Sequence, residues 1–97
     1  MITSNEAINN LKAFLVGGED APEYAPDGVL SMKHLSIEKF ARASNVTRTA
    51  VYNYINNVNR PTLYTLRKMA EALEIPLDEI LNYCTPAPHG RPKTKSL

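Results

Sequence analysis

The sequence predicts an all-α fold, and three features of residues 35–81 lead to this prediction. Apolar side chains recur there at i, i+3, i+4 and i+7, the spacing of an amphipathic helix. The small residue Ala41 lies where two helices would cross steeply, and such helices can approach closely only at a short side chain. Asparagines lie where the chain would reverse. Together these features indicate two helices joined by a tight turn, a helix-turn-helix.

The first helix of the pair is expected to begin at Ser36, whose hydroxyl can accept a hydrogen bond from a backbone N–H exposed at a helix start. Phe40 and Ala41 would then face inward, and a valine at position 41 would force the helices apart. Asn45 is the expected turn residue, because a chain that reverses after a helix needs a residue that tolerates positive φ. Glycine does so best, and asparagine next.

The second helix is expected to follow Thr47, which would cap its start. Val46 would fill the core just before it, and Val51 and Tyr54 repeat at i+4 and i+7 from Thr47 to form a buried stripe. Asn57 would end the helix in the left-handed conformation that glycine usually adopts. These boundaries place the helix-turn-helix pair at about residues 36–57.

The remaining face of the second helix is polar, and we expect it to be exposed. Its side chains match the hydrogen-bonding groups of base edges and phosphates, and they are Arg48, Thr49, Tyr52, Asn53 and Asn56.

The distribution of charge agrees with a surface that meets phosphates. The whole chain has a formal net charge of only +1, but residues 37–68 contain six basic residues against Glu38 alone, which gives this segment +5. Such an asymmetry concentrates positive potential on one part of the surface. The alternative interpretation is that these charges are simply the solvated faces of amphipathic helices.

Residues 36–81 resemble the Cro/cI repressor (XRE-type) helix-turn-helix family. The run NVTRTAVYNYINNVNRP, residues 45–61, fits the turn, recognition helix and following loop of that family without a gap. The two glycines of the family would be replaced by Asn45 and Asn57, and the loop proline would be Pro61. Ile37 departs from the pattern, since many members have there a glutamine that contacts phosphate. The resemblance implies an all-α, five-helix Cro/cI-like (lambda-repressor-like) domain, with two helices after Pro61.

The resemblance also implies a sequence-specific DNA-binding regulator, a repressor that binds a palindromic operator in double-stranded DNA as a homodimer. On this hypothesis the base-reading residues are Arg48, Thr49, Tyr52 and Asn53, and the phosphate-binding residues are Thr47, Asn56, Asn59 and Arg60.

Three other functions stay open. The chain could be the antitoxin of a toxin–antitoxin pair, an autorepressor whose long loop or tail binds the toxin. It could instead be a protein-interaction module, like the bridging coactivators that share the fold without reading bases. The third alternative is an architectural nucleoid protein. Binding to one palindrome would favour the repressor, whereas a protein partner without DNA affinity would favour the bridging module.

A single domain is expected over residues 1–83, because 97 residues can build one core but not two. Its first helix would begin at a capping box in residues 3–6, carry a stripe of Ile8, Leu11, Phe14 and Leu15, and end at Gly17. The loop at residues 17–34, between the first two helices, is longer than in the family. We expect it to pack on the domain, with contact to a second copy or protein partner, or disorder, as the alternatives.

Residues 84–97 are expected to form a flexible basic tail, because they contain too few apolar side chains to offset the entropy of ordering. Gly90-Arg91-Pro92, followed by Lys93 and Lys95, resembles the core of an AT-hook, an element that lies in a narrow minor groove. The alternative is a solvated end without function.

The residue inventory argues against catalysis and cofactors. Cys84, His89 and His34 are too few to build a zinc site, and the sequence contains no nucleophile turn, zinc-protease motif or phosphate-binding loop. A single cysteine excludes an internal disulfide. The absence of a signal start and of a long apolar run predicts a soluble, cytoplasmic protein without membrane contact.

Overall fold

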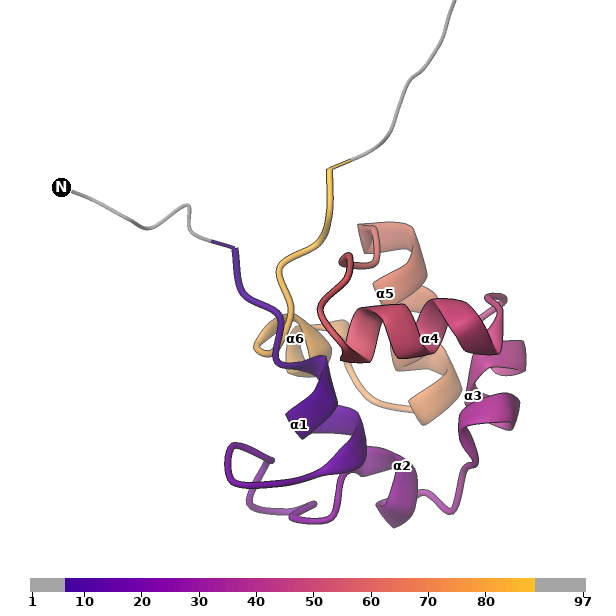
Figure 1. Ribbon diagram of the computed structural model, residues 1–97. Helices are drawn as coiled ribbons and strands as arrows, with labels where there is room; N and C mark the ends of the chain where they lie inside the picture. Colours follow the sequence, from indigo (N-terminus) through magenta and orange to yellow (C-terminus); the bar gives the residue numbers. More distant parts are fainter. Residues whose placement is uncertain (1–6, 89–97) are drawn as a thin grey trace, which may run out of the picture.

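The structure is a computed structural model, and it describes residues 7–88. Within this range the chain forms six helices and no strand (Figure 1). They are α1 (Leu11–Val16), α2 (Val29–Met32), α3 (Ile37–Ala43), α4 (Arg48–Ile55), α5 (Leu63–Leu73) and α6 (Leu77–Leu81). The predicted all-α architecture is confirmed, and α2 is a short additional helix inside the predicted loop.

The helix-turn-helix pair is formed by α3 and α4. The Ser36 hydroxyl oxygen accepts a hydrogen bond from the Lys39 N–H at 3.1 Å, and the Thr47 hydroxyl oxygen accepts one from the Ala50 N–H at 3.0 Å. Asn45, between the helices, has a φ of 63°. Both predicted caps and the predicted turn residue are therefore confirmed.

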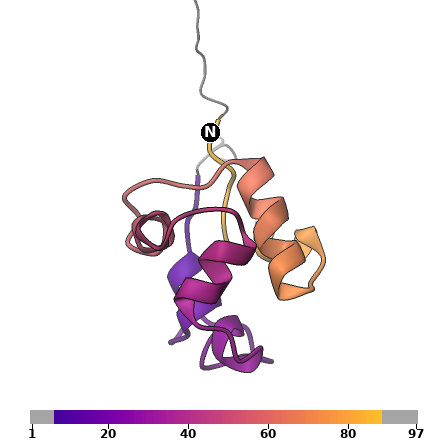
Figure 2. The same ribbon diagram turned by 90° about the vertical axis from the view of Figure 1, so that its right-hand side faces the viewer.

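The core lies where α3, α4 and α5 meet α1. Phe40 and Ala41 of α3 and Val51 of α4 are buried, and α5 adds four buried residues, Leu66, Met69, Ala70 and Leu73. Figure 2 shows α4 end on beside α3, with α5 and α6 on the other side. The second helix of the pair therefore lies at the surface and is held along one side.

The loop between α1 and α3 packs on the domain, as we expected. Its residues Ala25, Val29 and Leu30 are buried. Gly17 and Gly28, with φ of 101° and 94°, let the loop return close to the end of α1, since a Cβ at either position would collide with the backbone opposite. The Tyr24 hydroxyl also donates to the Glu79 carboxylate at 2.7 Å, which ties the loop to α6.

The two ends of the described chain lie side by side. The Thr85 N–H donates to the Ile8 carbonyl at 2.9 Å, and the Asn10 N–H donates to the Tyr83 carbonyl at 2.6 Å. Ile8 lies before the start of α1 and is 42% exposed. The apolar spacing of the sequence had predicted Ile8 to lie on the helix.

The domain also extends beyond residue 83. Cys84 is fully buried, and the Ala87 N–H donates to the Pro61 carbonyl at 2.8 Å. These contacts correct the predicted start of the tail at residue 84, because the packed chain continues through Ala87. The predicted capping box at residues 3–6 and residues 89–97 lie outside the described residues.

Candidate nucleic-acid interface

The exposed face of α4 carries the side chains that sequence reasoning selected for base reading. Val51 is the buried residue of this helix. Arg48, Thr49 and Tyr52 are exposed, and Asn53 is partly exposed. The structure thus brings these four side chains together on one surface helix.

Both ends of α4 are defined by local backbone chemistry. Thr47 caps the start, and Asn57, with a φ of 62°, follows the last turn. The Asn57 N–H donates to the Tyr54 carbonyl at 3.2 Å and the Val58 N–H to the Asn53 carbonyl at 2.8 Å, so backbone groups that a helix end leaves without a partner are paired. The predicted helix end at Asn57 is confirmed.

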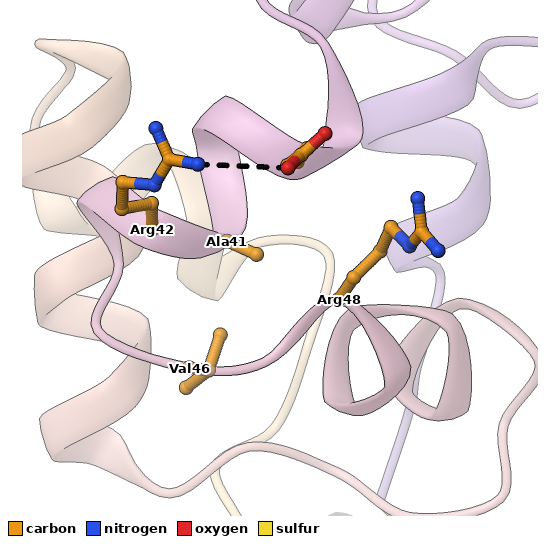
Figure 3. Close-up of a pocket in the computed structure, with 5 residues that line it drawn as sticks. Ala41, Arg42, Val46 and Arg48 are labelled. Atoms are coloured by element: carbon orange, nitrogen blue, oxygen red, sulfur yellow. Dashed lines mark ion pairs between the residues drawn. The ribbon is translucent and has the colours of Figure 1, made fainter.

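A shallow cleft of about 350 Å³ lies between α3 and the start of α4. Ala41 and Val46 form its apolar part, with Arg42 and Arg48 on either side (Figure 3). A nitrogen of the Arg42 guanidinium is 3.5 Å from a carboxylate oxygen of Glu38, and the two side chains are 75% and 65% exposed. Such an exposed ion pair contributes little in water. The Arg42 guanidinium is therefore held only weakly by Glu38.

The four residues expected at phosphates lie at the ends of α4 and in the loop that follows it. Thr47, Asn56 and Asn59 are exposed, and Arg60 is partly exposed. The Nε–H of Arg60 donates to the Thr85 carbonyl at 2.8 Å, which uses one of the five donors of the guanidinium. This intramolecular contact, which the sequence did not predict, fixes the direction of the Arg60 side chain.

A contact from the N-terminal segment to α4 was also missed. The Asn9 amide nitrogen is 2.9 Å from the Tyr54 carbonyl and 3.2 Å from the Asn57 side-chain oxygen. The partners are 45 and 48 residues away in sequence, and no local pattern signals such a pairing.

Other candidate sites are not supported within the described chain, or lie beyond it. In residues 7–88, no three His, Cys, Asp or Glu side chains are grouped so that they could hold a metal ion. No helix in the same range is long and apolar enough to cross a membrane. The possible minor-groove residues Arg91, Lys93 and Lys95 lie outside the described residues.

Comparison with known proteins identifies the family. The family model described as Helix-turn-helix matches residues 32–80, about half of the chain. This range begins at the last residue of α2 and includes α3, α4, α5 and most of α6. A search of curated proteins finds no match. The matched segment contains both capped helices, the left-handed turn at Asn45 and the exposed polar face of α4. The chain therefore belongs to the Cro/cI-type (XRE) helix-turn-helix family of DNA-binding regulators.

Proposed function

We propose that this DNA-binding regulator is a repressor that recognises a palindromic operator as a two-fold homodimer. The observation that carries the proposal is the polar surface of α4, on which Arg48, Thr49 and Tyr52 are exposed and Asn53 is partly exposed, whereas Val51 is buried. A helix of this kind fits the major groove of B-DNA, where each base pair presents a distinct pattern of donors, acceptors and methyl groups.

The side chains of α4 differ in what they can recognise. Arg48 can donate two hydrogen bonds to O6 and N7 of guanine, and Asn53 can pair with N6 and N7 of adenine. The ring of Tyr52, 46% exposed, suits the methyl group of thymine or a sugar. Thr49 can donate to or accept from either kind of base edge. Arg48 and Asn53 are the proposed sources of most of the specificity.

Contacts with phosphates would set the register of α4 in the groove. We assign them to Thr47, Asn56, Asn59 and Arg60, which lie at both ends of α4 and in the following loop. The net charge of +5 on residues 37–68 favours the approach of this surface to DNA.

The proposed dimer follows from the size of the reading element. The eight residues of α4 can contact only a few base pairs, and two copies related by a two-fold axis would double the sequence that is read. Two half-sites about 34 Å apart, one turn of B-DNA, are expected.

Selection of bound sequences from random duplex DNA tests the proposal, with the mass of the complex measured by light scattering. The expected result is a palindromic site that binds two chains. A site without palindromy that binds one chain would contradict the dimer. Tight binding of a protein partner by a chain without measurable DNA affinity would contradict base reading and support the bridging module.

A further inference from the structure

The side chain of Asn9 connects three parts of the fold that are distant in sequence. Its Nδ2 donates to the Tyr54 carbonyl at 2.9 Å and to Asn57 Oδ1 at 3.2 Å, at the end of α4. Its Oδ1 accepts from the Leu11 N–H at 3.1 Å, at the start of α1. One amide therefore joins the last turn of α4 to the first turn of α1, and both its donor and its acceptor are used.

The position of Asn9 is itself fixed by the C-terminal segment of the domain. Asn9 pairs with Cys84 in an isolated antiparallel bridge, and the flanking hydrogen bonds join Asn10 to Tyr83 and Thr85 to Ile8. Cys84 is fully buried. Because the backbone on both sides of Asn9 is held, its amide provides a fixed point for the helix that it contacts.

The other contacts at this end of α4 come from the partly buried side chains of Tyr54 and Ile55, which pack against the core. Its start is joined to α3 by the tight turn at Asn45, but Val51 is the buried residue along its length, and Tyr54 and Ile55 are only half buried. A helix that is fixed at its start, and held along its length by one fully buried and two partly buried side chains, can still tilt about that start. The amide of Asn9 opposes such a tilt at the far end.

We propose that Asn9 is a positioning residue for base recognition, which sets the angle at which α4 presents Arg48 and Asn53 to the groove. The inference rests on the proposed function. A bidentate contact to a base requires a well-defined direction, whereas attraction to phosphates tolerates small displacements. Loss of the amide should therefore reduce specificity more than it reduces binding to DNA in general.

The test compares Asn9→Ala with Asn10→Ala, an identical change one position further along. Within the described chain, the side chain of Asn10 makes no capping hydrogen bond. Affinities of the full chain for its selected duplex and for a scrambled duplex are measured at one salt concentration, with the folded fraction measured by circular dichroism. We expect Asn9→Ala to reduce the ratio of the two affinities about tenfold, with less than a twofold change for the scrambled duplex. Asn10→Ala should leave the ratio unchanged.

A second variant keeps the test decisive if Asn9→Ala folds poorly. Asn57→Gly retains the left-handed backbone but removes the Oδ1 that accepts from Asn9, and it should reduce the ratio in the same direction. Amides in the last turn of α4 should also exchange faster with solvent in either variant.

An unchanged ratio in a folded Asn9→Ala or Asn57→Gly variant would overturn the inference and leave the proposed function intact. Equal losses for both duplexes, in proportion to the folded fraction, would also overturn it. Failure of the parent chain to select any sequence would overturn the proposed function, and the inference with it.

Discussion

Three asparagines determine how α4 is placed. Asn45 and Asn57 adopt φ of 63° and 62° at the turn before the helix and at its end. The sequence predicted both, because positive φ restricts the choice of residue at that position. Asn9 was not predicted, since its role depends on partners 45 and 48 residues away. Local backbone chemistry can be inferred from sequence, whereas a side chain that joins distant segments requires the fold.

The turn residue gives a prediction about stability. Asn45→Gly should be neutral or mildly stabilising, because glycine adopts a φ of 63° without strain. Asn45→Val should lose at least about 1–2 kcal/mol, the cost of left-handed backbone, with more for the branched Cβ. Thermal unfolding of both variants provides the measurement. Equal melting temperatures for the two would contradict the strain argument.

The buried thiol of Cys84 gives a prediction about pH. Burial raises the pKa of Cys84 from 9.0 to about 11, although the positive charge of Arg60 acts in the opposite direction. The folded chain therefore retains a proton that the unfolded chain has lost between about pH 9 and pH 11. The contribution to stability is complete below pH 9 and decreases as pH rises through this window.

Urea unfolding of the parent and of Cys84→Ala between pH 8 and pH 11 tests this expectation. The parent should lose stability more steeply, because only the parent carries the buried thiol. Burial and a hydrogen bond to Glu79 also raise the pKa of Tyr24 to about 12, but that effect is common to both chains and does not separate their curves. Parallel curves for the two chains would show that the thiol does not contribute.

At the scale of elements, the ends of the helices differ in how well they were predicted. The starts of α3 and α4 were predicted because Ser36 and Thr47 are hydrogen-bonding caps with partners three residues away. The end of α5 was not, because Glu74 adopts a left-handed φ of 59° that its residue type does not favour. A strained residue at a helix end carries no signal in the sequence.

Glu74→Gly should therefore stabilise the domain by up to about 1 kcal/mol, since glycine relieves the left-handed strain. Glu71→Gly, the same change inside α5, is the matched control and should destabilise by about 1 kcal/mol. Chemical unfolding of both variants measures the difference. Destabilisation by Glu74→Gly would indicate that the glutamate side chain itself holds the end of α5.

The proposed reading helix gives a prediction about specificity. Asn53→Ala should cost roughly 1–3 kcal/mol on the selected duplex, and the preference at one base pair should be lost, because a bidentate contact discriminates only its cognate base. Competition between duplexes that differ at single positions provides the measurement. A uniform loss at all positions would place Asn53 at the phosphates instead.

At the scale of the whole molecule, the sequence predicted the helix-turn-helix and two helices after Pro61, but not how the ends of the chain are arranged. Periodic apolar patterns extend over several turns and can be read directly. The pairing of residues 8–10 with residues 83–85 consists of one isolated bridge and its flanking hydrogen bonds, and the low apolar content of residues 84–97 had predicted a tail from residue 84. The hydrogen bond from Tyr24 to Glu79 joins side chains that are 55 residues apart in sequence, and no local pattern predicts it either.

Two truncations separate the packed end of the domain from the basic residues beyond it. If Arg91, Lys93 and Lys95 follow DNA, removal of residues 89–97 should lower the salt slope of binding by up to about 2.7, because each phosphate contact adds about 0.9. The melting temperature should not change.

Removal of residues 84–97 should lower the melting temperature, since the buried Cys84 and the hydrogen bonds of Thr85 and Ala87 are lost. An unchanged salt slope for the shorter truncation would indicate a solvated end without DNA contact.

The hydrogen bond between Thr85 and Ile8 holds the two ends of the described chain close together. Both ends of the described domain lie near the loop that follows α4, on the opposite side of the molecule from the loop at residues 17–28 (Figures 1 and 2). An affinity tag or second domain fused to an end would therefore start close to the surface proposed for DNA. A fluorescent label for binding studies belongs instead at the exposed residue Glu19, and the loop around it is also a suitable place for the new termini of a circular permutant.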